Sequence, residues 1–280
     1  MKYLVTGGSG FVGSHLCDKL IQEGHEVICI DNNLTSSKSN IEHLLHNNNF
    51  QYVYSDILDI RDIECDGIFH LASPTDPVVC KKYPLITIDV NTTGTSKLVK
   101  IAMEKGIPLL YMSSIRVKDE QQTCYSEAKR IGETYCLQSN DLYGTKCKIA
   151  RCSHIYGPRM AKNDGRVIPT FIRNALSNED ITVIDTVDSF CYVDDAVRGL
   201  YKFMQSEHKG VIEFCGYDIL LITLADLIKD IIKSKSKILI IPHHSKRNFT
   251  NNRNASILGW DPTIKIAAGL EKLFKSILEL

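Results

Sequence analysis

The sequence lacks the features that would place the protein in a membrane or on nucleic acid. It contains no run of 18 apolar residues, so no segment is expected to cross a bilayer. Lys plus Arg equals Asp plus Glu at 33 each, and this balance gives no excess of positive charge to attract nucleic acid. Strand-forming residues begin at Tyr3, which leaves no room for a signal peptide. We therefore expect a cytoplasmic protein with no membrane partner and no nucleic-acid partner.

Paired cysteines and clustered metal ligands are also missing. The ten cysteines are scattered with no Cys-X-X-Cys pair, which is typical of reduced thiols in a protein without disulfides. His243 and His244 form a pair with no third ligand in sequence, so we interpret them as part of a surface loop. The sequence therefore predicts no metal site.

A glycine pattern stands at the start of the chain. An apolar run at Tyr3–Val5, long enough for one buried strand, leads directly into Gly7, Gly10 and Gly13. Apolar residues then recur at helical spacing, and the order of strand, glycine turn and helix lets a pyrophosphate approach the helix N-terminus. A second predicted strand ends in Asp31, whose carboxylate can accept both hydroxyls of an adenosine ribose. This order predicts a dinucleotide site, with a glycine turn that binds no ligand as the alternative.

Strands and helices alternate along the first half of the chain. Further strands are predicted at 50–54, 67–72, 109–112 and 148–151, and helices at 89–105 and 125–137. This alternation predicts an α/β fold of Rossmann type, in which a doubly wound parallel sheet carries helices on both faces.

The pattern becomes irregular after residue 163. Helices are expected near 167–177 and 224–233 and from residue 267 onward. We predict a dinucleotide-binding Rossmann domain over residues 1–152 and a smaller, mainly substrate-binding part over 153–280. Residues of about 190–216 are expected to return to the first domain.

Ser114, Tyr125 and Lys129 form the second signal. Tyr125 and Lys129 have the Tyr-X-X-X-Lys spacing and follow a predicted strand that ends at Ser113 and Ser114. A tyrosine can exchange a proton with the substrate oxygen while hydride moves to or from a nicotinamide, if its pKa is lowered from about 10. A lysine one helical turn away can supply that cation and hold the nicotinamide ribose, and a serine can orient the substrate oxygen. These three are the predicted catalytic residues, and a surface lysine near a packed tyrosine is the alternative.

Motifs along almost the whole chain match one known family. They are TGGSGFVGSHL at Thr6–Leu16, HLASP at His70–Pro74, DVNTTGT at Asp89–Thr95, ARCSHIYGPRM at Ala150–Met160, NDGRV at Asn163–Val167, YVDDAVRGL at Tyr192–Leu200 and ILGWDPTIKIAAGLEK at Ile257–Lys272. Together with Asp31 and the spacing of Tyr125 and Lys129, they show that the chain resembles an extended short-chain dehydrogenase/reductase of the nucleotide-sugar epimerase, dehydratase and decarboxylase group. HLASP combined with GPRM and NDGRV is most similar to the UDP-glucuronate decarboxylases.

The resemblance implies where ligands bind. In that family NAD occupies the first domain and a nucleoside-diphosphate sugar the second, with Ser or Thr, Tyr and Lys around C4 of the sugar. The predicted cofactor-binding residues are Gly7, Gly10, Phe11, Val12, Gly13, Asp31, Asn32, Asp56, Ile57, Leu71, Ala72, Ser73, Asn91, Tyr125 and Lys129. The predicted substrate-binding residues are Ser73, Arg116, His154, Arg166, Val167 and Asp188, with Arg166 near the phosphates. The expected partners are NAD and a nucleoside-diphosphate sugar, a UDP-sugar first, and a homodimer is a candidate assembly.

Several departures from the family pattern bear on the reaction. Where decarboxylases have Thr-Ser-Glu-Val-Tyr-Gly, this chain has Ser-Ile-Arg-Val-Lys-Asp, so Arg116 replaces their glutamate. Ile115 and Arg116 stand where dehydratases need an Asp-Glu acid/base pair. Asp188 replaces their arginine ahead of Phe-X-Tyr-Val, and His154 replaces the usual Asn ahead of Tyr-Gly-Pro-Arg. Only ten residues separate Ser114 from Tyr125, so the loop that covers the sugar is short. The exchange of Arg116 and Asp188 is either drift in an inactive pocket or a swapped ion pair.

These substitutions remove the additional acid/base residues of decarboxylases and dehydratases. Hydride transfer with a tyrosine proton relay does not need them. The sequence therefore predicts an NAD-dependent nucleotide-sugar oxidoreductase acting at C4, with 4-keto reduction slightly preferred over 4-epimerisation. The short loop favours reduction, because an epimerase must retain a loose 4-keto intermediate. Asp31 favours tightly held NAD, which suits epimerases and decarboxylases. A UDP-glucuronate decarboxylase and a non-catalytic protein that binds NAD or a nucleotide sugar are the alternatives.

Cofactor preference tests the role of Asp31. If its carboxylate binds the ribose diol, it repels the 2′-phosphate of NADP by like charge. We expect NAD(H) to bind much more tightly than NADP(H), and Asp31→Ala to narrow the difference, in calorimetric titrations of both cofactors. Equal affinity of the unmodified protein for the two cofactors would refute this assignment.

Overall fold

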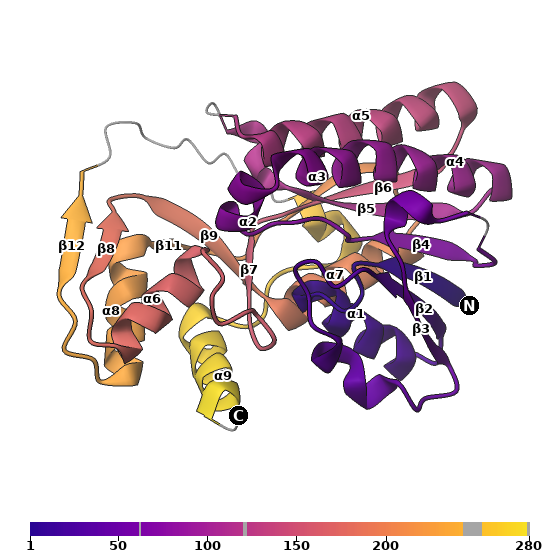
Figure 1. The fold of residues 1–280 in the computed structure, drawn as a ribbon. Coiled ribbons are helices and arrows are strands. Elements are labelled where there is room, and N and C mark those ends of the chain that lie inside the picture. The colour runs from indigo at the N-terminus through magenta and orange to yellow at the C-terminus, as the bar shows by residue number, and fades with distance from the viewer. Residues whose placement is uncertain (62, 120–121, 243–253, 279–280) are drawn as a thin grey trace.

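A seven-stranded parallel sheet forms the centre of the protein (Figure 1). The structure is a computed structural model that describes residues 1–61, 63–119, 122–242 and 254–278, so His243 and His244 lie outside the described residues. In spatial order the strands are β10 (Gly210–Phe214), β6 (Lys146–Cys152), β5 (Pro108–Ser114), β4 (Gly67–His70), β1 (Lys2–Thr6), β2 (Glu26–Asp31) and β3 (Phe50–Tyr54). Each strand runs parallel to its neighbours.

Helices cover both faces of this sheet, which confirms the predicted doubly wound α/β fold (Figure 1). One layer contains α3 (Pro84–Asp89), α4 (Thr95–Lys105) and α5 (Cys124–Tyr143), and the other contains α1 (Phe11–Gln22) and α7 (Val193–Gln205). The connections carry α2 (Pro77–Lys82) and the short helical turns η1 (Lys38–Leu44), η2 (Ile57–Asp59), η3 (Val90–Gly94), η4 (Ile115–Lys118) and η5 (Asn254–Leu258).

The strand order reverses between β1 and β4. The chain moves outward from β1 through β2 to β3, then crosses back to β4 and continues through β5 and β6. In open α/β sheets, ligands bind in the crevice outside the carboxyl ends of the strands at such a reversal. Gly7 and Leu71 follow these two strand ends, so the predicted cofactor residues lie at the crevice.

The second part of the chain is built on smaller sheets. β7 (His154–Tyr156), β9 (Val187–Tyr192) and β11 (Tyr217–Leu220) form one sheet, and β8 (Ile181–Ile184) pairs with β12 (Ile238–Ile241). α6 (Val167–Leu176), α8 (Leu221–Ile232) and α9 (Ile266–Leu278) pack around them (Figure 1). Within the later chain, two elements lie with the large sheet. β10 pairs with β6, and α7 packs against β5, β6 and α1. The domain boundary near residue 152 stays a prediction.

Two helices extend beyond their predicted limits. Helical structure ahead of 89–105 begins at Pro84, which fits the first turn of a helix, and it continues through the π-helical turn η3 into α4. α5 continues past residue 137 to Tyr143 and ends at Gly144, whose φ of +65° terminates the helix. The apolar pattern stops before these ends, whereas proline and glycine mark them.

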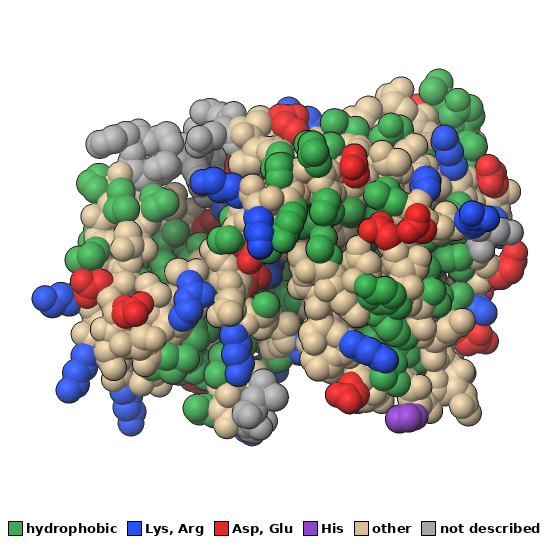
Figure 2. Space-filling model, in the orientation of Figure 1, with side chains coloured by type: hydrophobic (Ala, Val, Ile, Leu, Met, Phe, Trp, Pro, Cys, Tyr) green, Lys and Arg blue, Asp and Glu red, His purple; other side chains and the backbone are tan. Residues whose placement is uncertain are grey.

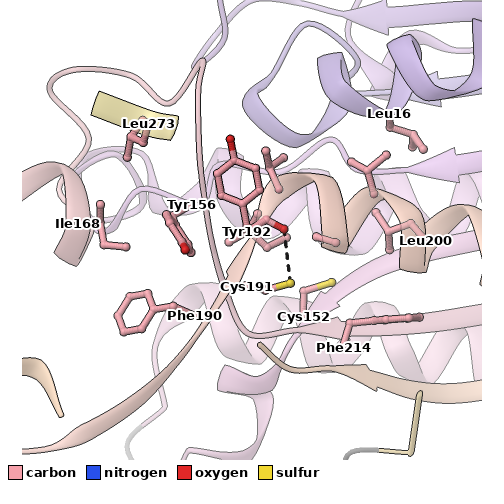
Figure 3. Packing of buried hydrophobic residues seen from close by; sticks show 14 of the residues in the cluster. Leu16, Cys152, Tyr156, Ile168, Phe190, Cys191, Tyr192, Leu200, Phe214 and Leu273 are labelled. Carbon is pink, nitrogen blue, oxygen red and sulfur yellow. Dashed lines mark hydrogen bonds between the residues drawn. The ribbon is translucent and has the colours of Figure 1, made fainter. Parts of the chain in front are cut away.

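A buried apolar cluster joins the two parts of the chain. Figure 3 shows Tyr156, Phe190 and Tyr192 of β7 and β9 near Cys152 and Leu273. The rings of Tyr156 and Tyr192 meet edge to face with centroids 5.5 Å apart, a favourable geometry for aromatic pairs. Because Cys152 ends a strand of the large sheet and Leu273 belongs to α9, this cluster packs both parts against one another.

Asp195 holds the segment that precedes α9. Its carboxylate accepts hydrogen bonds from the backbone N–H groups of Thr263 and Ile264, each at 2.8 Å, and from Thr263 Oγ1 at 2.7 Å and Arg198 Nη2 at 2.6 Å. The Trp260 indole N–H donates to the Asp195 carbonyl oxygen at 2.8 Å. Burial alone would raise the pKa of Asp195, but these donors hold it below its ordinary value.

We expect Asp195→Asn to lower the free energy of unfolding by about 2 kcal/mol at pH 7, because an amide cannot accept all four hydrogen bonds. The folded-state pKa of Asp195 is depressed, so this stabilisation is present above the unfolded pKa of about 4 and is lost as pH falls through the folded value. Urea unfolding at pH 7 and pH 3 measures the difference, which should shrink at the lower pH.

The exposed Asp194 in the same turn of α7 offers a matched control. Asp194→Asn removes the same charge near the helix N-terminus and should change stability by no more than about 0.5 kcal/mol. Similar losses in the two variants would show that helix charge, rather than the contacts of Asp195, stabilises the fold.

Candidate active site

The glycine loop after β1 leaves no room for side chains. Gly7 has a φ of +71°, and a Cβ atom there would lie 2.7 Å from the backbone of Ala72. A Cβ atom on Gly13 would collide with the Gly7 carbonyl oxygen, so α1 packs directly on the loop. α1 begins at Phe11, and the first turn of a helix has unpaired N–H groups that bind anions. The loop and helix therefore form a cradle for a pyrophosphate.

Asp31 ends β2 at the wall of the same crevice. Its oxygens accept hydrogen bonds from the backbone N–H groups of Ser9 at 3.1 Å and Asn33 at 2.9 Å, and from Ser36 Oγ at 2.8 Å. The carboxylate is therefore held in one orientation beside the glycine loop, where the sequence predicts the adenosine ribose.

A large cavity joins the glycine loop to the second part of the chain. Its volume is about 1740 Å³, and Figure 2 shows the surface hollowed between the two parts. The predicted site residues that line it are Gly7, Gly10, Phe11, Val12, Gly13, Asp31, Asn32, Asp56, Ile57, Leu71, Ala72, Ser73, Ser114, Arg116, Tyr125, Lys129, His154 and Arg166. One continuous cavity thus spans the predicted cofactor and substrate sites.

Asn91, Val167 and Asp188 lie behind the cavity wall, although the sequence predicts that they contact ligands. Asn91 is fully buried in η3, and its Nδ2 donates to Ser73 Oγ at 3.0 Å. Val167 begins α6 and packs against the apolar core. Asp188 is buried behind side chains that do line the cavity. Asn91 and Asp188 thus contact residues that line the cavity, namely Ser73 for Asn91 and Arg116 and His154 for Asp188.

Ser114, Tyr125 and Lys129 come together at the cavity wall. Ser114 ends β5, whereas Tyr125 and Lys129 lie in the first turns of α5, whose start is fixed by a capping box. Lys129 Nζ lies 5.9 Å from the centre of the Tyr125 ring and donates to the Met112 carbonyl oxygen at 2.7 Å. The predicted catalytic residues therefore share one site.

Burial sets the protonation of two of these groups. It raises the pKa of Tyr125 to about 12, although a hydrogen bond with Ser114 acts in the opposite direction. Burial also lowers the pKa of Lys129 to about 7. The sequence predicted that the lysine cation would lower the tyrosine pKa, but in the structure desolvation outweighs charge interactions. The phenol therefore keeps its proton at neutral pH.

Arg116 and Asp188 form a swapped ion pair. Arg116 Nη2 lies 3.2 Å from Asp188 Oδ2, and Nη1 lies 3.1 Å from Asp119 Oδ2. His154 Nε2 lies 2.7 Å from Arg116 Nη2 and 2.9 Å from Asp188 Oδ2. Burial alone would raise the pKa of Asp188, but His154 and Arg116 hold it below its ordinary value. Arg116 and Asp188 are therefore in contact in this chain, as the ion-pair alternative of the sequence analysis expects.

Two arginines of the cavity wall were not predicted. Arg159 follows the Tyr-Gly-Pro turn with a φ of +66°, and its Nη1 lies 2.8 Å from Asp18 Oδ2. Arg173 lies on α6, seven residues after Arg166, so helical spacing could have identified it as a neighbour on the same face. Both add positive charge near Arg166.

The described part of the chain has neither a metal-binding cluster nor a membrane-spanning helix. There, no group of three or more His, Cys, Asp or Glu side chains is arranged to hold a metal ion. None of the helices described is long and apolar enough to cross a bilayer.

Comparison with known proteins gives the family. Residues 3–214 match the NAD dependent epimerase/dehydratase family. The chain belongs to this family. The resemblance seen in the sequence is therefore confirmed, and NAD is the cofactor of the family.

Individual relatives cover nearly the whole chain. UDP-glucuronic acid decarboxylase 1 of Danio rerio is 35% identical over 297 residues, which cover 97% of this chain and 71% of that protein. The structure of Pal from Bacillus thuringiensis has a TM-score of 0.89 at 25% identity, covering 100% of this chain and 99% of that one. UDP-glucuronic acid 4-epimerase from Bacillus cereus, solved with UDP-glucuronic acid and NAD, has the same fold, with a TM-score of 0.88 at 23% identity, covering 100% and 99%.

The residues of this chain fit NAD. Gly7, Gly10 and Gly13 line the cavity with backbone alone, and α1 supplies backbone donors to a pyrophosphate there. Asp31 stands at the end of β2 with its carboxylate oriented by three donors. NAD, when bound, accepts or returns a hydride at the nicotinamide. Tyr125 and Lys129 lie farther along the same cavity, where the predicted catalytic step takes place.

Removal of the phenol oxygen tests the proton relay. Tyr125→Phe should lower turnover on the order of 100-fold or more and leave NAD affinity unchanged, because only the phenol oxygen is lost. Lys129→Ala should reduce both, since the lysine contacts the tyrosine ring and is placed to hold the ribose. Turnover of a nucleotide sugar and calorimetric titration with NAD measure the two effects.

Tyr135→Phe is the matched control, because Tyr135 lies on the same helix and is 42% exposed. It should change neither turnover nor NAD affinity. Near-normal turnover of Tyr125→Phe would mean that another acid performs the proton transfer.

Proposed function

We propose that the protein is an NAD-dependent oxidoreductase that acts at C4 of a nucleoside-diphosphate sugar, with reduction of a 4-keto sugar preferred to 4-epimerisation. The observation that carries the proposal is that Ser114, Tyr125 and Lys129 lie together in the cavity that also contains the glycine loop. Reduction requires a proton donor to the ketone oxygen, and a neutral phenol is such a donor. Ser114 Oγ accepts the backbone N–H of Arg116 at 3.2 Å, and its hydroxyl group also lies beside the Tyr125 phenol, so both side chains can face the substrate oxygen.

Positive side chains support binding of the diphosphate. Arg166 is oriented by Asp164, whose oxygens accept from Nε at 2.9 Å and Nη2 at 2.6 Å, and its guanidinium lies at the cavity. Arg159 and Arg173 line the same cavity, and a planar guanidinium matches the geometry of phosphate oxygens. A UDP-sugar is the expected partner, because the relatives that cover this chain are UDP-glucuronic acid decarboxylases.

The charges around Arg116 disfavour decarboxylation. Asp188 stays ionised, and its charge repels a uronate carboxylate by an amount that grows as the site dries. Arg116 already contacts the carboxylates of Asp119 and Asp188. Because their negative charges offset its positive charge, Arg116 attracts a third carboxylate only weakly. Tighter binding of the uronate ground state would not by itself speed loss of carbon dioxide. We therefore infer that the substrate is a neutral or 6-deoxy nucleotide sugar.

A UDP-glucuronate decarboxylase is the second candidate function. It is favoured by the 35% identity to the decarboxylase of Danio rerio across 97% of this chain. A non-catalytic protein that binds NAD or a nucleotide sugar is the third, and it differs from both enzymes by the absence of turnover in the unmodified protein.

The location and the oligomeric state of the protein remain predictions. We expect a cytoplasmic protein, and a homodimer is a candidate assembly. Leu142 and Tyr143 at the end of α5 are each 68% exposed, which is compatible with an apolar contact between two copies.

The decisive assay supplies UDP-glucuronate and NAD and measures carbon dioxide and UDP-xylose. We expect neither product above the protein-free background, because the charges at Arg116 and Asp188 are reversed relative to the decarboxylases. A 4-keto-6-deoxy nucleotide sugar supplied with NADH should instead be reduced, followed by NADH absorbance. Release of carbon dioxide at an ordinary enzymatic rate would establish the second candidate function.

Charge-reversal variants test whether the contact between Arg116 and Asp188 determines the charge environment of the pocket. Arg116→Glu places two carboxylates in contact and should lower stability, whereas Arg116→Glu combined with Asp188→Arg restores an ion pair. The double-mutant cycle should give a favourable coupling of about 1 kcal/mol or more. Absence of coupling would mean that the contact does not determine the charge environment of the pocket.

A further inference from the structure

His154 lies at the cavity wall between a carboxylate and a guanidinium, and the reduction proposed above does not use it. Its ring is stacked on Phe190 with centroids 5.2 Å apart. Nε2 lies 2.9 Å from Asp188 Oδ2 and 2.7 Å from Arg116 Nη2. Nδ1 has no hydrogen-bond partner among the described residues, and the His154 side chain, which is 18% exposed, lines the cavity.

The two contacts at Nε2 correspond to the two tautomers of the neutral ring. When Nε2 carries the proton, it donates to Asp188, and Nδ1 has a free lone pair. When Nε2 instead accepts from Arg116, the proton lies on Nδ1. The tautomer that donates to Asp188 is the one in which Nδ1 can act as a base. A buried carboxylate on the far nitrogen also stabilises the imidazolium that forms when a histidine acts as a base.

His154 is close to the place where the substrate oxygen is expected. Ser114 pairs with Cys152 across β5 and β6, and His154 follows Cys152 by two residues as β6 gives way to β7. Arg116, whose guanidinium contacts His154, has its backbone N–H on Ser114 Oγ at 3.2 Å. The serine expected at the C4 oxygen and the imidazole therefore lie on neighbouring strand ends at one wall of the cavity.

We propose that His154, held by Asp188, removes and returns a proton on a carbon next to the C4 ketone of a nucleotide sugar. The protein would then also enolise its 4-keto sugar and exchange, or invert, the hydrogen at C3 or C5. This inference rests on the proposed function for the identity of the ligand as a 4-keto nucleotide sugar.

The step is balanced without an oxidant or a reductant. His154 Nδ1 takes the proton, and the electron pair of the broken C–H bond forms a C=C bond with C4. The π pair of the C=O bond moves to the C4 oxygen, which takes the phenol proton of Tyr125. Return of a proton to the carbon, with return of the phenol proton, restores the ketone.

Solvent exchange tests the proposal on a ketone that is supplied directly. UDP-4-keto-6-deoxyglucose is incubated with the protein and NADH in D₂O, and deuterium at C3 and C5 is measured by NMR and mass spectrometry. We expect incorporation above the protein-free control. His154→Asn, which introduces the residue usual in the resembled decarboxylases, should lower exchange on the order of 100-fold, because the amide cannot take the proton. Asp188→Asn should also slow exchange.

His208→Asn is the matched control, because His208 is exposed and its described hydrogen bond uses the backbone carbonyl oxygen. It should exchange at the unmodified rate. The proposal is overturned if the unmodified protein incorporates no deuterium above background, whether or not NADH is oxidised, or if His154→Asn exchanges normally. Deuterium incorporation without NADH oxidation would refute 4-keto reduction and support the exchange reaction.

Discussion

The buried carboxylate of Glu133 is the group on which the register of the active site depends. It accepts hydrogen bonds from Ser113 Oγ at 2.5 Å and from Arg151 Nε at 2.8 Å and Nη2 at 2.6 Å. Ser113 directly precedes Ser114, Glu133 lies one turn beyond Lys129 on α5, and Arg151 pairs with Ser113 in the sheet. One charged group therefore aligns the strand that carries the serine with the helix that carries the tyrosine and lysine. Loss of Glu133 or of Arg151 would leave the other charge without this partner in a low-dielectric interior.

The same network reaches the short segment that carries Arg116. Arg151 Nη1 lies 3.5 Å from Glu213 Oε1, and Lys118 Nζ lies 3.0 Å from Glu213 Oε2. Lys118 and Arg116 both belong to η4, so this helical turn is attached to β10 through one cation and to β9 through the other. Ion pairs with β9 and β10 thus hold this short connection between β5 and α5 in place.

Family membership and chemistry are separate conclusions for this chain. The glycine loop, Asp31 and the Tyr125–Lys129 spacing are shared with enzymes that perform several reactions, and a fold does not determine which reaction occurs. At three positions where the sequence analysis expects departures from the family pattern, this chain has a cluster of Arg116, His154 and Asp188 whose side chains contact one another. We infer that its charge arrangement favours chemistry next to a ketone over loss of a carboxylate.

The sequence by itself determined the fold class and the glycine cradle, and it predicted the three positions expected to be catalytic. Those features depend on local patterns, such as an apolar run before glycines or a tyrosine and a lysine one helical turn apart. Only the tertiary structure decided the protonation of Tyr125, the burial of Asn91 and the partners of His154. Arg116 is 38 residues from His154 and 72 from Asp188, and no local pattern records such contacts. The tyrosine pKa likewise depends on how completely distant segments exclude water, which is a property of packing and not of spacing.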